Sequence, residues 1–187
     1  MEFNELLQVT RRDILSLDDS HGYTTDINHI YELFYAGLER NCKTIVEIGS
    51  YLGVSTLALS YIQRFYPLLS ITSVDLCDEI SSDYRQNYWH KHGVNYIESK
   101  DCSTWDFINN ARYNRTKYDY IFHDAQHGDI VVNEYIALST LINEGGVLAM
   151  HDLDQITDLD GLISKINFKS YKTMTDIKGR TTGIFYK

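Results

Sequence analysis

Apolar and polar residues follow two different rhythms along this chain. Before residue 43, apolar side chains recur every three or four positions, which predicts helices at residues 4–17 and 26–40. Beyond that point, short apolar runs alternate with helical stretches. The expected strands are 44–49, 71–75, 94–98, 118–123 and 146–151, with helices between them at 54–66, 79–91, 104–113 and 129–143. This regular alternation predicts a parallel sheet covered by helices.

The last part of the chain changes the pattern. A helix is expected at 155–166, followed by two strand candidates, 169–175 and 182–187. Because the link between these strands is so short, they should pair antiparallel. We therefore predict an α/β fold, a doubly wound sheet of five parallel strands plus a C-terminal antiparallel hairpin strand, with helices on both faces. The active site of such a sheet lies at the carboxyl ends of its strands.

Nothing in the composition divides the chain into separate units. The 187 residues include one proline, and they contain no glycine-rich or serine-rich linker and no repeated period. We expect a single domain over residues 1–187, with N-terminal helices in 1–42 and the core in 43–187.

Charge and cysteine content narrow the possible partners. The formal net charge is -9, and lysines and arginines are scattered, which argues against nucleic acid. The N-terminal stretch has early acidic residues and no continuous apolar core, so we expect neither a signal peptide nor a membrane span. The three cysteines form no Cys-x-x-Cys pair and are expected to be free thiols in a reducing compartment. The expectation is a cytoplasmic protein with no nucleic-acid or membrane partner.

A glycine turn follows the first expected strand. Residues 46–55 read VEIGSYLGVS, where Gly49 and Gly53 let the backbone turn sharply and approach a ligand. The run is neither the G-x-G-x-x-G of dinucleotide binders nor the G-x-x-x-x-G-K-[ST] of phosphate loops. Glu47 would repel a phosphate and suits a cationic ligand rich in hydroxyl and amino donors, such as S-adenosylmethionine. The alternative for Glu47 is a buried pairing with a basic neighbour.

Acidic residues also end later strands. Asp75 closes the second expected strand, where a carboxylate accepts hydrogen bonds from ribose hydroxyls. The alternative is an N-cap of the next helix, but Asp78 could serve there equally well, which favours ligand binding by Asp75. Asp124 and His127 share the loop after the fourth strand, and Asp152 follows the fifth. Because these strands are expected to be parallel neighbours, we predict that the three ionisable side chains converge.

With these motifs, the chain resembles class I S-adenosylmethionine-dependent methyltransferases, whose Rossmann-like fold has five parallel strands and a terminal hairpin. The resemblance covers roughly residues 43–187. The run EIGSYLGVSTLALS is similar to small-molecule O-methyltransferases of the catechol and caffeoyl-CoA type and to related sugar O-methyltransferases. The motifs SVDL, ESKD, FHDAQHGD and GGVLAMHD follow in order, near the ends of the second to fifth strands. The resemblance implies S-adenosylmethionine as cofactor and methyl transfer to a hydroxyl of a small molecule, a phenol or a sugar.

The resemblance also implies which residues contact the cofactor. The expected contacts are Glu47, Gly49, Ser50, Gly53, Ser55, Asp75, Leu76, Asp101, Cys102 and Asp124. Asp101, Cys102 and Ser103 should border the adenine. Capping of the helix that starts near residue 104, by Ser103 or Asp101, is an equally good interpretation.

Two residues are the candidates for catalysis, His127 and Asp124. His127 aligns with the lysine that takes the proton from the acceptor hydroxyl in the catechol-type enzymes, and a histidine titrates near neutral pH. Asp124 is expected to hold a neighbouring oxygen of the acceptor, directly or through a cation. The alternative for His127 is a polar residue at a helix N-terminus with no role.

The resemblance leaves a divalent cation open. Asp124 and Asp152 match the two metal-binding aspartates of the metal-dependent members, and oxygen ligands suit Mg²⁺. Leu153, however, stands where the catechol-type enzymes have an asparagine. His151 or His127 is a candidate for the vacant position, and an enzyme without a metal is equally open. For His151 the favoured interpretation is a strand-end histidine hydrogen-bonded to the backbone.

The expected partner is a small-molecule hydroxyl acceptor, and a homo-oligomer is left open. The acceptor pocket should be built from the N-terminal helices and residues 81–93, although packing onto the sheet explains the aromatic residues there at least as well. Two other functions remain as alternatives. One is a non-catalytic S-adenosylmethionine-binding module, and the other is a nicotinamide-dependent oxidoreductase on a similar fold.

Overall fold

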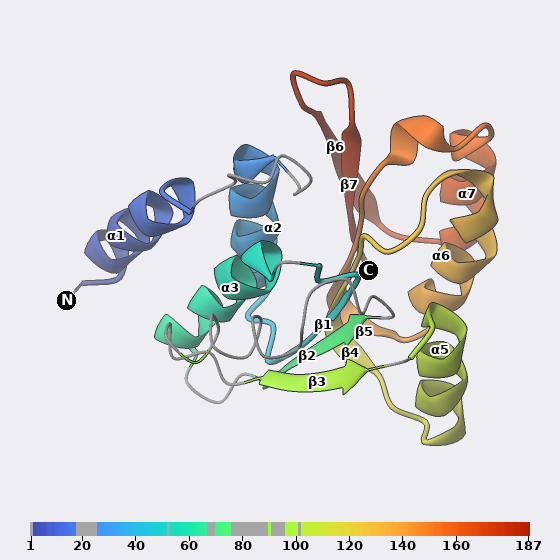
Figure 1. Ribbon diagram of the computed structural model, residues 1–187, viewed down its shortest axis with the longest axis horizontal. Helices are drawn as coiled ribbons and strands as arrows, with labels where there is room; N and C mark the ends of the chain where they lie inside the picture. Colours follow the sequence, from blue (N-terminus) through green and yellow to red (C-terminus); the bar gives the residue numbers. More distant parts are fainter. Residues whose placement is uncertain are drawn as a thin grey trace.

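A seven-stranded sheet in the order β3-β2-β1-β4-β5-β7-β6 organises the computed structural model, which describes residues 2–17, 26–51, 53–66, 70–75, 90, 96–100 and 102–187 (Figure 1). The strands of the described ranges are β1 Thr44–Ile48, β2 Ser70–Asp75, β3 Tyr96–Lys100, β4 Tyr118–His123, β5 Ile142–Met150, β6 Ser170–Thr175 and β7 Thr181–Tyr186. The first five pair in parallel, and β7 pairs antiparallel with both β5 and β6. The predicted α/β sheet of five parallel strands with an antiparallel hairpin strand is confirmed.

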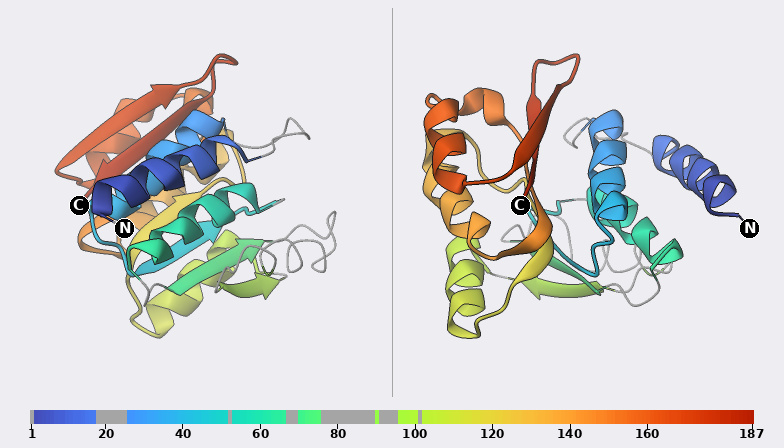
Figure 2. Two further views of the ribbon diagram at one scale, coloured as in Figure 1. Left: turned by 90° about the vertical axis from the view of Figure 1, so that its left-hand side faces the viewer. Right: turned by 180° about the vertical axis from the view of Figure 1, so that it is seen from behind.

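Helices cover both faces of this sheet. The α-helices are α1 Phe3–Leu15, α2 Ile27–Glu39, α3 Val54–Ser60, α5 Thr104–Tyr113, α6 Val132–Ser139 and α7 Leu159–Ile166, and short 3₁₀ helices are η1 Tyr61–Arg64, η2 Gly128–Val131 and η3 Leu153–Gln155. Helices α2 and α3 lie on one face, and α5, α6 and α7 lie on the other (Figure 2). Helix α1 lies outside α2 (Figure 2). No helix in these ranges is both long and apolar enough to cross a membrane.

The alternation of side chains along β1 builds both cores. Ile45 belongs to the core under α2 and α3, whereas Val46 and Ile48 belong to the core under α5, α6 and α7. Such strands are buried on both faces, as the apolar runs predicted. Glu47 lies on the same face as Ile45, and it is therefore a carboxyl group in an otherwise apolar layer.

Some boundaries differ from the prediction. β5 begins at Ile142, four residues before the predicted start, because Tyr118 pairs with Ile142 before a register shift in the β4–β5 pairing. Residues 94 and 95 of the predicted third strand lie outside the described residues, and β3 runs on to Lys100. The hairpin places the antiparallel strand β7 beside β5 and leaves β6 outermost. The helix predicted at 79–91 lies outside the described residues except for His90.

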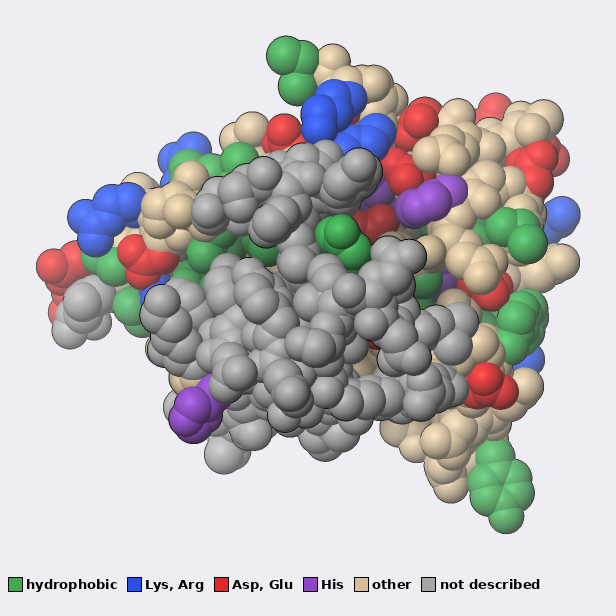
Figure 3. All heavy atoms as spheres, viewed as in Figure 1, with side chains coloured by type: hydrophobic (Ala, Val, Ile, Leu, Met, Phe, Trp, Pro, Cys, Tyr) green, Lys and Arg blue, Asp and Glu red, His purple; other side chains and the backbone are tan. Residues whose placement is uncertain are grey.

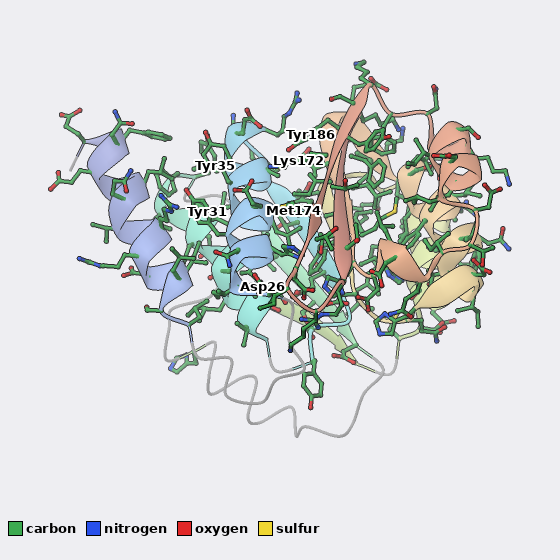
Figure 4. The ribbon with its side chains drawn as sticks, turned by 90° about the horizontal axis from the view of Figure 1, so that it is seen from above. Asp26, Tyr31, Tyr35, Lys172, Met174 and Tyr186 are labelled. Atoms are coloured by element: carbon green, nitrogen blue, oxygen red, sulfur yellow. The ribbon has the colours of Figure 1, made fainter. Side chains whose placement is uncertain are left out.

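The hairpin packs against α2 through polar and aromatic contacts. Lys172 of β6 lies 2.6 Å from the carboxylate of Glu32 on α2. The guanidinium of Arg40 lies over the ring of Tyr186 at 4.7 Å from its centroid. Figure 4 shows Lys172 and Tyr186 on one side of α2, and Tyr35 on the other side, toward α1. The last two strands are therefore fixed to the helix that precedes β1.

The turn after β1 depends on a close approach of two backbones. Gly49 has φ +88, and a Cβ there would lie 2.4 Å from the carbonyl oxygen of Asp124. Two backbone hydrogen bonds hold this contact in place, from the amide of Gly49 to Val74 and from the amide of Asp124 to Ile48, both 2.8 Å. Only glycine fits this position without moving the loop after β4.

Replacing Gly49 with Ala should destabilise the fold more than the same change at Gly179. Gly179 has φ +87 and no atom within 4 Å of an added Cβ, so Gly179→Ala should cost only the left-handed penalty of about 1–2 kcal/mol. Gly49→Ala adds the steric conflict with Asp124, about 1–3 kcal/mol more. Urea unfolding of both variants measures the difference, and equal losses would contradict the close-approach argument.

Candidate active site

Asp75 ties the glycine turn to the end of β2. Its Oδ2 accepts hydrogen bonds from the backbone amide of Tyr51 at 2.8 Å and from the hydroxyl of Ser50 at 3.2 Å. Gly53, with φ +81, precedes α3 and completes the turn. The structure therefore brings Gly49, Ser50, Gly53 and Asp75 together, and it places a buried carboxylate beside the turn, where the resemblance puts the ribose.

Glu47 is fully buried beneath the start of α3. Its two carboxylate oxygens accept hydrogen bonds from the hydroxyls of Ser55 and Thr56. The described residues include no basic side chain paired with it, and the partners are hydroxyls instead. Burial raises the pKa of Glu47 to about 7, although these two hydrogen bonds lower it. Asp124 and Asp75 raise the same pKa further through charge repulsion.

Four ionisable side chains meet where β4 and β5 end. Nδ1 of His151 lies 3.1 Å from Oδ1 of Asp124 and 3.0 Å from Oδ1 of Asp152. Nδ1 of His127 lies 2.8 Å from Oδ2 of Asp152. The predicted convergence of Asp124, His127 and Asp152 is thus present in the structure. His151 lies at its centre.

The side chain of His151 is buried and faces the two carboxylates. The favoured interpretation of His151, a side chain hydrogen-bonded to the backbone, was therefore wrong. Burial lowers its pKa, but the contacts with Asp124 and Asp152 dominate and raise the pKa to about 9. At neutral pH this side chain is an imidazolium.

Asp152 is the carboxylate shared by the two histidines. Burial raises its pKa, but the hydrogen bond and charge of His151 outweigh burial and lower the pKa overall. The charges of His127 and Arg180 lower it further. Asp152 therefore stays ionised, and it can hold the imidazole of His127 in one orientation.

His29 of α2 and Thr182 of β7 lie on one side of His151, and they were not among the residues that the sequence predicted for the site. His29 of α2 is buried, its ring centroid is 6.5 Å from that of His151, and its Nδ1 is 3.0 Å from the hydroxyl of Thr182. Burial lowers the pKa of His29, and the charge of Arg180 acts in the same direction. One signal was available: His29 precedes Leu33 by four positions and so lies on the apolar face of its helix.

The loop before α5 bears out the capping interpretation for Ser103. The Ser103 hydroxyl accepts from the amide of Asp106 at 3.0 Å, and the Asp106 carboxylate accepts from the amide of Ser103 at 3.1 Å. This is a capping box. Cys102 is half-buried beside it. Leu76 and Asp101, two of the expected cofactor contacts, lie outside the described residues, as do the aromatic residues expected near 84–89.

Acidic and histidine side chains are also visible together on the surface. Figure 3 shows both kinds side by side on one face of the molecule, with lysine or arginine side chains nearby. Among the described residues of the cluster, His127 is the most exposed, with 45% of its side chain accessible, against 19% for Asp124. His127 is therefore the member of the cluster that a small molecule reaches most easily.

The cluster has the donor set of a cation site. One ligand atom each from Asp124, His151 and Asp152 lies within 4.8 Å of the others. Leu153 does not complete this set, because it is buried and its side chain fills the space that Gly183 leaves on β7. Two carboxylates and an imidazole fit a divalent cation, and the imidazole must lose its proton to become a ligand.

Comparison with known proteins identifies the family. A family described as a methyltransferase domain matches residues 46–153, more than half of the chain. The chain therefore belongs to this methyltransferase family, as the resemblance implied. No curated protein sequence matches it. The matched segment runs from the glycine turn to the cluster at the end of β5 and contains most of the site described above.

Solved structures share the fold at low sequence identity. An O-methyltransferase from Bacillus cereus, in complex with S-adenosylhomocysteine, has a TM-score of 0.65 at 15% identity and covers 98% of this chain and 90% of its own. The O-methyltransferase TomG from Streptomyces achromogenes, in complex with S-adenosylmethionine, has a TM-score of 0.67 at 15% identity, covering 100% and 91%. The S-adenosylhomocysteine-bound methyltransferase PaMTH1 from Podospora anserina reaches 0.62 at 15%, covering 98% and 88%. The fold of this chain is that of O-methyltransferases.

The charge on His151 should make the stability of the protein depend on pH. The raised pKa stabilises the fold fully below the ordinary histidine value of 6.5, and this contribution is lost as pH rises through about 9. We expect the melting temperature of the wild type to fall between pH 6.5 and 9.5, and the fall to be smaller in His151→Gln. Glu47→Gln should retain the part of the fall above about pH 8, because the pKa of Glu47 is about 7 and its own effect is complete by then. A parallel fall in wild type and His151→Gln would contradict the assignment.

Proposed function

We propose that this protein is an S-adenosylmethionine-dependent methyltransferase that methylates a hydroxyl of a small molecule. The observation that carries the proposal is the position of the cluster of Asp124, His127, His151 and Asp152. The cluster lies at the carboxyl ends of the parallel strands, next to the glycine turn whose backbone is hydrogen-bonded to Asp75. The neighbours named as O-methyltransferases support it through the shared fold.

The residues of the turn fit the cofactor. When bound, S-adenosylmethionine supplies a methyl group on a positively charged sulfur. Asp75 has a carboxylate beside the turn for ribose hydroxyls, and the backbone at Gly49 and Gly53 has no side chain to obstruct a close approach. Asp75 and Asp124 place acidic side chains at this end of the strands, where a cationic ligand is attracted.

His127 is the proposed general base. Its Nδ1 faces the ionised Asp152, so the proton of the neutral imidazole lies on Nδ1 and leaves Nε2 as the basic nitrogen. A base of this kind takes the proton from the acceptor hydroxyl as the oxygen attacks the methyl group. Asp152 orients the ring and stabilises the imidazolium that forms, so it serves as a positioning residue.

His29, Thr182 and Arg180 are proposed to form the acceptor side of the site. They come from α2 and from the hairpin of β6 and β7, and they lie near His151 and Asp152. The glycine turn proposed for the cofactor belongs to other elements. The three side chains offer a neutral imidazole, a hydroxyl and a guanidinium, which suits an acceptor rich in oxygen atoms. This location agrees with the expectation that the N-terminal helices contribute to the acceptor pocket.

Two substitutions should separate catalysis from cofactor binding. His127→Ala should lower kcat by about 10²–10⁴ with little change in cofactor affinity, because it removes a base and not a cofactor contact. Asp75→Ala should weaken S-adenosylmethionine binding by about tenfold or more, the loss of hydrogen bonds to a charged acceptor. Calorimetry and turnover measurements with a panel of phenol and sugar acceptors report the two effects. Equal loss of cofactor affinity in both variants would contradict these roles.

A divalent cation is proposed to bind Asp124, Asp152 and His151, where it would draw two acceptor oxygens together. A crystal soaked with S-adenosylhomocysteine and Mn²⁺ should show anomalous density between the two aspartates, and Asp152→Asn should lose it. Calorimetry should also detect proton release on Mn²⁺ binding, because His151 must deprotonate. Density elsewhere, or none, would leave the charged histidine as the group that neutralises the aspartates.

Binding without turnover is the outcome that favours the other candidate, a non-catalytic cofactor-binding module. The feature behind it is Leu153, which packs against β7 and leaves one position of the catechol-type ligand set without a polar side chain. A protein that binds S-adenosylmethionine and methylates no acceptor, even with Mn²⁺ or Mg²⁺ present, would match that function.

A further inference from the structure

Glu47 differs from the other acids of the site in its surroundings. It has no exposed surface, and its hydrogen-bond partners are the hydroxyls of Ser55 and Thr56 on α3. No ion pair to it exists among the residues that the structure describes. A carboxylate in such a position is costly unless a positive charge compensates it or it carries a proton.

A second buried polar group lies beside Glu47. Ser73 of β2 is the direct cross-strand neighbour of Glu47, and its hydroxyl is fully buried without a hydrogen-bond partner among the described residues. Buried hydroxyls in proteins nearly always have a partner, so an orphaned one requires an explanation. Glu47 and Ser73 together form a polar pair inside the layer between β1, β2 and α3.

Among the described residues, the titratable groups that act on Glu47 come from several elements, and none of them is basic. Asp75 ends β2 and Asp124 follows β4, and both repel a negative charge on Glu47. The phenol of Tyr120 on β4 is buried and neutral, and burial keeps its pKa well above the ordinary value. The environment therefore favours the protonated form of Glu47 until a cation arrives.

We propose that Glu47 is protonated in the free enzyme and releases its proton when the cationic cofactor binds, so that the enzyme distinguishes S-adenosylmethionine from neutral S-adenosylhomocysteine by charge. The inference rests on the proposed function and extends it to cofactor selection. The positive sulfur compensates the carboxylate, whereas the thioether of the product does not. Product release is then favoured by return of the proton.

Ser55 offers the route for this proton. Its hydroxyl is hydrogen-bonded to Glu47, and the residue is partly exposed at the start of α3. In the protonated form, the carboxyl O–H donates to one of the two hydroxyls. When the proton passes to solvent through Ser55, both hydroxyls donate to the carboxylate, which is the arrangement of the ionised form. One O–H bond breaks on Glu47 and one forms on a solvent base, with no other bond changed.

The pKa of Glu47 determines how cofactor affinity and proton release should depend on pH. Burial sets the pKa of Glu47 near 7. If only the ionised form binds the cation, affinity for S-adenosylmethionine should rise about tenfold between pH 6 and pH 8, and binding at pH 7 should release about half a proton. Affinity for S-adenosylhomocysteine should change much less over the same range.

The experiment is calorimetry of the full chain with each of the two ligands, at pH 6, 7 and 8, in phosphate and in Tris. The difference in heat between the buffers gives the number of protons released. Glu47→Gln keeps the shape and the hydroxyl contacts but cannot titrate. It should lose the pH dependence and the proton release specific to S-adenosylmethionine, and its preference for S-adenosylmethionine over the product should shrink. Because the wild type and Glu47→Gln bind the same ligand, protons released by the ligand itself contribute equally to both measurements.

Asp160→Asn is the matched control, because it removes an exposed carboxylate of α7 that lies outside the site. It should behave as the wild type. If Glu47→Gln does not fold, infrared difference spectra of the wild type give the second measurement, since the C=O band of a protonated carboxyl should disappear when S-adenosylmethionine is added. Tight binding with no such proton release would overturn this inference alone. No binding of either ligand at any pH would overturn the proposed function itself.

Discussion

The contact between the glycine turn and the loop after β4 is the constraint on which the site depends. Gly49 lets the backbone of Asp124 approach to a distance that no side chain would allow, and the hydrogen bonds of both residues extend the sheet at this point. The same contact places the acids of the turn next to those of the loop. One glycine thus sets the distance between the turn after β1 and the groups that follow β4.

Charge balance is the second organising feature of this edge of the sheet. Each acid is stabilised in a different way: Asp75 by a backbone amide and a hydroxyl, Asp152 by two histidines, and Glu47 by hydroxyls alone. These differences in environment separate groups of similar chemistry into different roles. The contacts with His151 and His127 lower the pKa of Asp152, whereas burial raises that of Glu47.

Much of the fold followed from the sequence because strand and helix periodicity were strong. The helix at 104–113 and the strand at 118–123 have the predicted boundaries. The start of β5 was missed because residues before 146 are polar and glycine-rich, and they join the strand only through pairing with Tyr118. The order of β6 and β7 depends on how the hairpin folds back, and no local pattern encodes that.

The site shows the same division between local and long-range information. Asp124, His127 and Asp152 could be grouped from their positions at strand ends, since parallel neighbours bring those ends together. The orientation of His151 could not be predicted. Strand alternation indicates only on which face of the sheet a side chain lies, and the contacts with Asp124 and Asp152 fix the direction of the ring. His29 and Thr182 meet through the tertiary fold alone, from opposite ends of the chain.

That last contact joins residues 153 positions apart. During synthesis, the helix that carries His29 leaves the ribosome long before β7, so the contact between His29 and Thr182 can form only after β7 has been made. Contacts of such large sequence separation form late and slowly in folding. A nascent chain would therefore contain Glu47 and Asp75 before His29 can meet Thr182. The site would stay incomplete until β7 pairs with β5.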